Sequence, residues 1–552
     1  SVLSSMIQRQ VSWKSDTDER AQGTSNKTRN YRSFSIDSRR SSRAGTTKTV
    51  AFKDETEGCS IGKVLAPGSS HLKLIILCAI LSAVTNFPEG YCNSYPNTSY
   101  NSFQKMINTS FVDRGDEGGM STSQFTWYWS FTLNIWFLGD LIGTLVTPFF
   151  TDYLGRRKAL LTANSCALVG AVLSFTSVTL AIPELFIVSR FTTSISSGMS
   201  FGALILFLQE ATPTTERGIC SFICETTFIF TTALGIGGGM DIFFGQDLPV
   251  LTGIAMVPAV LSILLTLPLH ETPKFLFINK NNKKAALASL EFYQGRSLDN
   301  QRSLDEMFVE KEIGSYEDDE EVSILSGAVE VMRTPHLRMA FFLGAASLQI
   351  TVGIWPILYL STDLLTENFD LETSQVASLL FIIADFAASL LGILFVERYN
   401  RRALLISFGL ANTASLVLFI IADLLIPVWE PARWGQIGAL VLFGLTYGFA
   451  VGPIAFFITS ELVPQRSRSI VQTMVFCVST IMNFLLSFAT LPAYTAFGVL
   501  TFLPLLVIPA VLCELFLYYY LPETRGREVN CTLYRSLLHV TYNGTRKIIV
   551  RD

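Results

Sequence analysis

Long apolar segments recur along most of the chain and give the first indication of its structure. A helix needs about 20 apolar residues to cross the hydrocarbon core of a bilayer. Because backbone groups cannot stay unpaired in lipid, apolar segments of this length are predicted to be helices. The pattern predicts an all-α membrane protein with twelve transmembrane helices, the first of which is short. They are expected at residues 72–88, 126–150, 158–181, 184–208, 218–240, 249–269, 338–362, 374–396, 403–427, 434–459, 468–491 and 496–521.

The composition supports a membrane protein and excludes several other classes. Apolar residues make up 49% of the 552 residues and charged residues only 16%, whereas a soluble protein has about 25% charged residues. A net charge of −4 offers no basic surface to nucleic acid. The four histidines lie far apart, the nine cysteines form no regular framework, and the sequence has no G-x-x-x-x-G-K-[ST] phosphate loop. We therefore expect no enzyme activity, no metal or other cofactor and no nucleic-acid partner, and we expect lipid around the helices.

Polar segments separate the apolar ones into domains. Residues 1–70 are rich in Ser, Thr and Arg and are expected to form a disordered tail. A six-helix bundle is predicted at 71–270 and a second one at 338–521. The charged segment 271–337 between them is expected to be a cytosolic linker with short helices, and 522–552 a second tail.

The charges of short loops predict the orientation in the membrane. The loop at 152–158 reads Asp-Tyr-Leu-Gly-Arg-Arg-Lys, and the loop at 398–402 contains three arginines. The segment 361–374 instead carries four acidic residues and no Lys or Arg. Because short basic loops stay in the cytoplasm, both termini are expected to be cytosolic, in a multi-pass protein of the cell membrane.

Three motifs occur once in each half of the chain, at displacements of 245 to 252 positions. Gly155-Arg156-Arg157 returns as Asn400-Arg401-Arg402, Glu210-x-x-Pro-x-x-x-Arg217 as Glu461-x-x-Pro-x-x-x-Arg468, and Glu271-Thr-Pro as Pro-Glu523-Thr. Internal repeats with a binding site at their interface are typical of transporters. The alternative, that basic loops only anchor the topology, does not explain the matched spacing of Glu, Pro and Arg.

These motifs together resemble the sugar porter family of the major facilitator superfamily, the glucose-transporter-like proteins. The resemblance covers roughly residues 70–525 and includes Arg190 and the segment Glu271 to Leu276. It implies two six-helix bundles, a central solute site between them and transport by alternating access.

Charged residues of the repeated motifs are interpreted as a cytosolic latch that holds the bundles together in one state and opens in the other. Exposed ion pairs are weak, about 0–1 kcal/mol each, but several together can bias a carrier whose states differ by a few kcal/mol. The alternative is a set of structural ion pairs that anchor the topology. Glu210 and Glu461 are expected to approach Arg217 and Arg468 or the basic loops. The candidate gating residues are Arg156, Arg157, Glu210, Arg217, Glu271, Arg401, Arg402, Glu461, Arg468 and Glu523.

The resemblance also places candidate solute contacts. The stretch from Gln349 to Trp355 resembles the family sequence Gln-Gln-Leu-Ser-Gly-Ile-Asn, with Gln349 retained and Trp355 in place of the Asn. Phe456 follows a Gly-Pro pair where the family often has Trp, Asn483 falls on a family amide, and Ser479 replaces another. Amides and hydroxyls suit sugar hydroxyl groups because they donate and accept hydrogen bonds.

Two further candidate solute contacts are acidic where the family has amides. Glu225 falls on a family Gln and Asp385 on a family Asn, and Asp140 is a third acid inside a span. Glu89 lies about one turn before Cys92, the position of the acid in proton-coupled relatives. Intramembrane acids are functional hypotheses by default. They are expected to act as neutral hydrogen-bonding groups, to carry protons or to bind a cationic solute, unless they are paired structural acids.

The leading interpretation is a carrier of a small polar solute, which the resemblance implies to be a hexose or a related polyol. A proton-coupled carrier, with protons as co-substrate, and an organic-cation carrier are the alternatives within transport. A non-transporting nutrient receptor is the alternative outside it. Two glycosylation sequons, at Asn97 and Asn108, are expected on the outer side, with Asn108 favoured because Asn97 lies nearer to the membrane.

Overall fold

The computed structural model divides into two units, residues Ser1–Gly58 and Cys59–Asp552, which are described separately. Strands β1 (Arg32–Phe34) and β2 (Val50–Phe52) of the first unit pair antiparallel, with Arg32 opposite Phe52. Apart from these strands and residues 69–70, the tail expected at residues 1–70 lies outside the described residues, as does the second tail from residue 525 on. The structure describes residues 32–34, 50–52, 69–114, 120–213, 217–295, 300–301, 303–305, 307–308, 324–396, 398–463 and 465–524.

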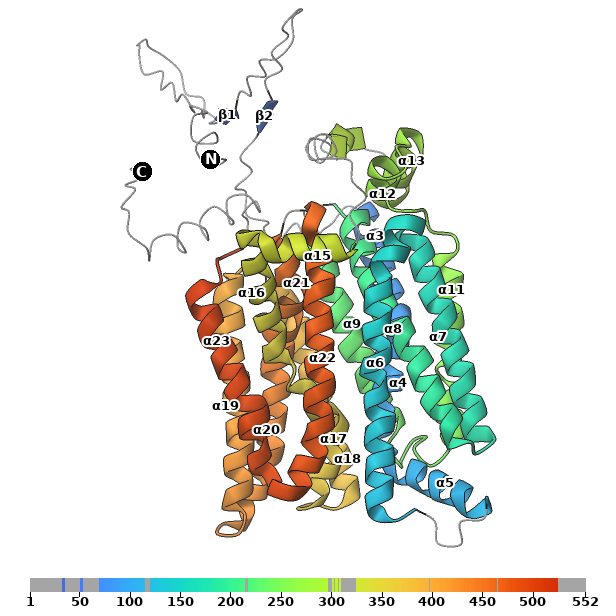
Figure 1. Cartoon of the computed structure of the whole chain (residues 1–552), viewed down its shortest axis with the longest axis vertical. Helices are drawn as coiled ribbons and strands as arrows, with labels where there is room; N and C mark the ends of the chain where they lie inside the picture. The colour runs from blue at the N-terminus through green and yellow to red at the C-terminus, as the bar shows by residue number, and fades with distance from the viewer. Residues whose placement is uncertain are drawn as a thin grey trace, which may run out of the picture. The chain divides into compact units, whose positions relative to one another are not determined.

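The first half of the helical unit forms one bundle, shown in blue to green in Figure 1. Two short helices, α12 (Pro273–Ile278) and α13 (Lys283–Gln294), follow it. The bundle consists of α3 (Ser69–Thr85), α4 (Phe87–Thr98), α5 (Tyr100–Asp113), α6 (Thr122–Leu154), α7 (Arg156–Thr179), α8 (Pro183–Ala211), α9 (Arg217–Gly238), α10 (Leu248–Gly253) and α11 (Met256–Thr266).

The second half forms another bundle, shown in yellow to red in Figure 1. Helix α15 (Ile324–Arg333) precedes it and lies at the same end of the helical unit as α12 and α13. We call this end the motif end and the opposite one the α5 end. The bundle consists of α16 (Pro335–Thr351), α17 (Ile354–Thr366), α18 (Leu371–Phe395), α19 (Arg401–Leu425), η1 (Glu430–Ala432), α20 (Arg433–Thr446), η2 (Tyr447–Val451), α21 (Gly452–Leu462), α22 (Gln465–Phe497), η3 (Gly498–Thr501), η4 (Leu503–Val507) and α23 (Ile508–Tyr520).

The helices confirm the all-α membrane fold with two bundles. Among the described residues, eleven helices are long and apolar enough to cross a membrane, and a bent pair of helices makes a twelfth span. Large apolar side chains on the outer surface, such as Leu391, Leu410 and Leu512, are about half exposed. These side chains suit a surface that faces lipid, because apolar groups have no reason to avoid hydrocarbon.

The first span is longer than the predicted 72–88. It consists of Leu72–Thr85 and Phe87–Thr98, which meet at an angle of 45°. The polar residues of α4 ended the apolar pattern, but most of this helix is buried inside the protein. Ser94 Oγ, for example, donates a hydrogen bond to the Thr232 carbonyl on α9 at 3.0 Å. Burial against protein instead of lipid therefore allows a polar helix at membrane depth.

The tenth span contains an irregular turn directly before a proline. The π-helical segment η2 precedes Gly452 and Pro453 at the start of α21. Proline has no N–H and its ring clashes with the preceding turn, and a π-turn is a common way to absorb such a defect. The Gly-Pro pair that precedes Phe456 therefore coincides with a break in regular helix geometry.

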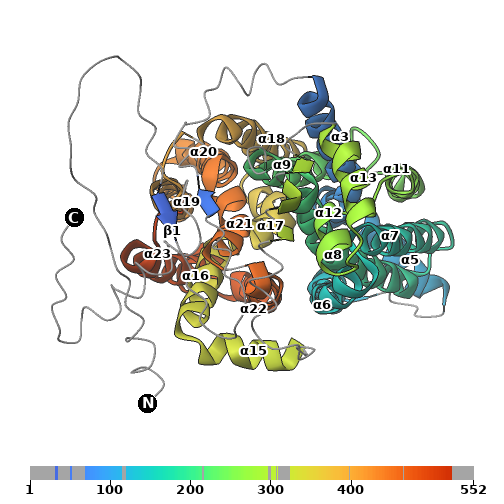
Figure 2. The same cartoon turned by 90° about the horizontal axis from the view of Figure 1, so that it is seen from above.

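The two bundles lie side by side when the helical unit is viewed along its helices (Figure 2). Across the interface, α6 packs against α22, α9 against α18, and α4 against α17. Each pair joins helices from different halves of the chain, so the interface between the repeats runs through the centre of the helical unit.

Candidate functional site

A cavity of about 610 Å³ lies between the bundles. Eight of its lining side chains carry polar groups, and several others are aromatic. Residues of both halves form its wall: Glu89, Asp140, Thr144, Gly198, Phe201, Glu225, Phe228, Thr351, Trp355, Phe456, Phe476, Ser479, Thr480 and Asn483.

Most of the predicted solute contacts meet in this cavity. Glu225 from α9, Trp355 from α17, Phe456 from α21, and Ser479 and Asn483 from α22 all line it. The ring centroids of Trp355 and Phe228 lie 6.1 Å apart across the bundle interface. Helices far apart in the sequence thus contribute to one site.

Two predicted contacts, Gln349 and Asp385, are not among the residues that line this cavity, and their role in solute binding stays a prediction. Gln349 lies on α16, where the neighbouring Thr351 lines the cavity instead. Asp385 on α18 is 1% exposed and packs against Gly448 of η2. The rotation of each helix about its axis decides which side chain faces the centre, and alignment by motif does not fix that rotation.

Two acids that the sequence had marked as unusual, but not as solute contacts, do line the cavity. Glu89 reaches it from α4 and Asp140 from α6. Asp140 Oδ2 accepts a hydrogen bond from Thr480 Oγ1 of α22 at 2.9 Å, which joins the two bundles. Their position inside apolar segments was the signal that could have added them to the predicted site.

A buried arginine organises the wall of the first bundle. Arg190 on α8 is 2% exposed, and its guanidinium donates to the carbonyls of Thr132 and Cys92 and to Asn93 Oδ1, at 2.9 to 3.2 Å. Asn93 Oδ1 also accepts from the Tyr359 hydroxyl of α17 at 2.7 Å. Arg190 therefore holds α4 and α6 together and is linked through Asn93 to the second bundle.

Nearer the α5 end, side-chain amides join the bundles directly. Asn97 Nδ2 donates to Ser361 Oγ at 3.0 Å, and Gln375 Nε2 donates to the Thr98 carbonyl at 2.9 Å. The Asn97 amide nitrogen, which would carry the glycan, is buried and donates to Ser361, which disfavours glycosylation at this site. Asn108 lies on α5 and is only half-buried.

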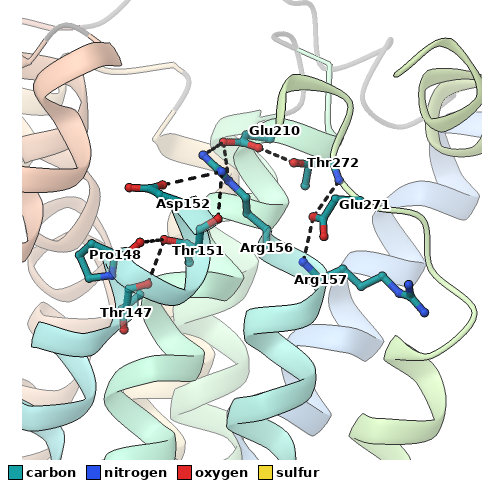
Figure 3. A network of polar contacts seen from close by, with 9 residues as sticks. All are labelled: Thr147, Pro148, Thr151, Asp152, Arg156, Arg157, Glu210, Glu271 and Thr272. Carbon is teal, nitrogen blue, oxygen red and sulfur yellow. Dashed lines mark hydrogen bonds and ion pairs between the residues drawn. The ribbon is translucent and has the colours of Figure 1, made fainter. Parts of the chain in front are cut away.

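At the motif end, the first half of the repeat forms a network around Glu210 (Figure 3). Arg156 Nη2 contacts Glu210 Oε1 at 2.8 Å, and Thr272 Oγ1 donates to Glu210 Oε2 at 2.5 Å. Glu271 Oε1 accepts from the backbone N–H groups of Arg157, at 2.9 Å, and Thr272, at 3.1 Å. Burial raises the pKa of the Glu271 carboxyl, and these two N–H groups oppose the shift.

The second half builds the corresponding network with the corresponding residues. The Arg401 guanidinium pairs with Glu461, and the backbone N–H groups of Arg401 and Arg402 donate to the two oxygens of Glu523 at 3.1 and 3.2 Å. The Arg402 guanidinium donates to the Tyr518 carbonyl, as the Arg157 guanidinium does to the carbonyls of Thr266 and Leu267. The repeat seen in the sequence is therefore a repeat of hydrogen-bond geometry.

These contacts form one of the two arrangements expected from the sequence, and the role of a latch stays a prediction. Glu210 and Glu461 pair with the arginines of the basic loops, Arg156 and Arg401, and each of these pairs lies within one bundle. Arg468 lies half-buried on α22, and the side chain of Arg217 falls outside the described part of the structure. Within the described residues, the networks thus tie helices of the same bundle to one another.

Comparison with known proteins agrees with this architecture. The family model described as "Sugar (and other) transporter" matches residues 78–531. Facilitated glucose transporter member 1 of Gallus gallus is 27% identical over 477 residues, which cover 85% of this chain and 94% of that protein. Member 7 of Mus musculus is 27% identical over 469 residues, with 83% and 89% covered.

Solved structures give the same fold. The proton:xylose symporter XylE bound to 6-bromo-6-deoxy-D-glucose has a TM-score of 0.69 at 17% sequence identity, with 84% of this chain and 99% of that chain covered. The inward open conformation of XylE from E. coli has a TM-score of 0.62 at 17% identity, with the same shares covered. The repeated motif networks and the cavity between two bundles agree with this family match. The chain therefore belongs to the sugar porter family of the major facilitator superfamily, a family of transporters.

Proposed function

We propose that this protein carries a hexose or a related polyol across the cell membrane by alternating access. The observation that carries the proposal is the single cavity shared by both bundles, with hydroxyl and amide groups close to aromatic rings. Hydroxyls and amides match the hydroxyl groups of a sugar, and aromatic faces match its apolar faces. Relatives that are named as glucose transporters support this substrate class.

The distribution of contacts supports alternating access. Each motif-end network ties helices within one bundle, so each bundle can move as one body. Among the described residues, the polar contacts between bundles are single hydrogen bonds between neutral groups at several places, such as Thr226 Oγ1 with Ser389 Oγ at 2.7 Å and Asn97 with Ser361 at 3.0 Å, together with the bond from Thr480 to Asp140. A neutral hydrogen bond contributes only about 0.5–1.5 kcal/mol, so these contacts can break and form again during each transport cycle.

Uptake of a radiolabelled solute panel into liposomes that contain the purified protein tests the proposal directly. We expect saturable uptake of at least one hexose or polyol, and an Asn483→Ala variant with a KM raised about tenfold because a cavity amide is lost. Binding without uptake would instead favour the receptor. Uptake that an imposed pH gradient drives uphill would favour proton coupling, with protons as co-substrate.

The proposed orientation places the motif end and both termini in the cytosol and α5 outside. We therefore expect a glycan at Asn108, which an Asn108→Gln variant loses, with a lower apparent mass. An Asn97→Gln variant should keep the parent mass, because Asn97 is buried. A glycosidase that leaves the apparent mass of the parent unchanged in an animal cell would contradict this orientation.

A further inference from the structure

Three carboxylates from three different helices of the first bundle meet at the central cavity. Glu89, Asp140 and Glu225 all line it. Glu225 is 4% exposed, and its Oε1 has no hydrogen-bond partner. The Oε2 atom of Glu89 is also buried without a partner. No Lys, Arg or His is among the described residues that line this cavity.

This arrangement leaves Glu89 Oε2 and Glu225 Oε1 as buried hydrogen-bond acceptors without donors. A buried polar group without a hydrogen bond is costly, and a buried charge more so. The nearby cation of the first bundle, Arg190, donates to the backbone carbonyls of α4 and α6 and to Asn93. Glu89 and Glu225 line the cavity, so a molecule that enters it can supply hydrogen-bond donors to their buried oxygens.

Aromatic rings complete the cavity around the acids. Phe228 comes from the same helix as Glu225, and Trp355 and Phe456 come from the second bundle. The faces of aromatic rings attract organic cations, especially where water is excluded. Thr480 and Asn483 of α22 supply hydrogen-bonding groups on the same wall. The cavity thus combines acceptors and rings for a cation with partners for hydroxyl groups.

We propose that the preferred solute is a hexose or polyol that carries a protonated amino group, held by Glu225 and Glu89. The ammonium group offers three donors to carboxylate oxygens, and the hydroxyl groups contact the α22 wall. Asp140 is already engaged with Thr480, so it adds negative charge but fewer free acceptors. This inference rests on the proposed function and specifies the substrate class of the same cavity.

The experiment compares three solutes of similar size in liposomes that contain the full-length protein at neutral pH. Glucosamine carries the amine, N-acetylglucosamine keeps the nitrogen without its charge, and glucose has a hydroxyl at that position. We expect glucosamine to have a KM at least about tenfold lower than the other two, because hydrogen bonds that involve charged groups are the stronger ones. Glu225→Gln should remove most of this preference, measured as the ratio of the KM values for glucosamine and glucose in the same variant.

A matched control comes from the second bundle. Glu514 on α23 is also 4% exposed, accepts from Thr413 Oγ1 at 2.8 Å and does not line the cavity. We expect Glu514→Gln to keep the preference for glucosamine. Binding of glucosamine to each purified variant, measured as a ligand-induced rise in Tm, reports on the site even if transport is slow.

The outcomes separate this inference from the proposed function. Uptake of glucose without preference for glucosamine would overturn the inference and leave the sugar carrier standing. The inference would also be overturned, with the sugar carrier left standing, if Glu225→Gln abolishes only the uphill uptake that a pH gradient drives. That result would make Glu225 a proton carrier. Absence of uptake for all three solutes and for the wider panel would overturn the proposed function itself.

Discussion

The two halves of the molecule are most alike at the motif end and least alike at the cavity. At the motif end, Arg156 with Glu210 has its counterpart in Arg401 with Glu461. At the cavity, both halves supply rings and hydroxyls, but all three acids come from the first half and the one amide comes from the second. The two motif ends are alike because both bundles need the same helix connections to stay rigid. The cavity walls can differ because the two sides of a solute differ, so the two halves need not offer it the same groups.

The motif-end networks also differ in detail. The side chains of Arg156 and Glu210 are 11% and 8% exposed, whereas those of Arg401 and Glu461 are 13% and 27% exposed. Gly155 has a φ of 99°, while Asn400 at the same place in the repeat has a φ of −66°. The first half also has a hydrogen bond from Thr272 to Glu210, whereas Thr524 Oγ1 and Glu461 Oε2 in the second half are buried without a partner among the described residues. The first network is therefore more enclosed, has one more hydrogen bond and has a more constrained backbone.

The largest expected effect tests this difference in burial. Glu210→Ala leaves Arg156 in an enclosed site with only the more exposed Asp152, at 3.8 Å, as a carboxylate partner, and breaking a buried pair costs about 3–5 kcal/mol. Glu461→Ala removes a more solvated partner, for which about 1.5–3 kcal/mol is expected. Thermal unfolding of the purified variants should show a lower Tm for Glu210→Ala. Equal losses of Tm would mean that the two networks are equivalent in energy as well as in geometry.

A smaller effect is expected from the backbone between the paired helices. Gly155→Ala places a methyl group about 2.7 Å from Cδ of Glu271, at a φ that L-residues rarely adopt. Left-handed backbone costs a non-glycine residue of order 1–3 kcal/mol, so the Tm should fall. Asn400→Ala, at an ordinary φ, serves as the control and should change stability by less than about 1 kcal/mol. A Gly155→Ala protein as stable as this control would contradict the constraint.

The smallest effect concerns the contact between the halves instead of the networks within them. Ser389→Ala removes a hydrogen bond of about 0.5–1.5 kcal/mol to Thr226 across the bundles. We expect little change in Tm but a shift of up to about tenfold in the balance of conformations, read as a changed rate of solute exchange. Thr226→Val and the double variant complete the cycle. Additive effects of the two substitutions would show that the bond does not couple the bundles.

Much of the fold follows from local sequence signals. The apolar segments located eleven spans because lipid requires both apolar side chains and a helical backbone. The first span was cut short at residue 88, since the polar face of α4 is buried against α9 and not exposed to lipid. The spacing of Glu, Pro and Arg similarly revealed the repeat, although not the partner of each charge.

The sequence by itself determined the class of the protein, the two-fold repeat and the positions of its intramembrane acids. Only the tertiary structure decided that Glu210 pairs with Arg156, that Asp385 lies outside the cavity wall, and that Glu89 and Asp140 line it beside Glu225. The physical reason is the same in each case. Helix formation and membrane insertion depend on the chain locally, whereas a binding site depends on how each helix is rotated and on which helix of the other bundle it faces.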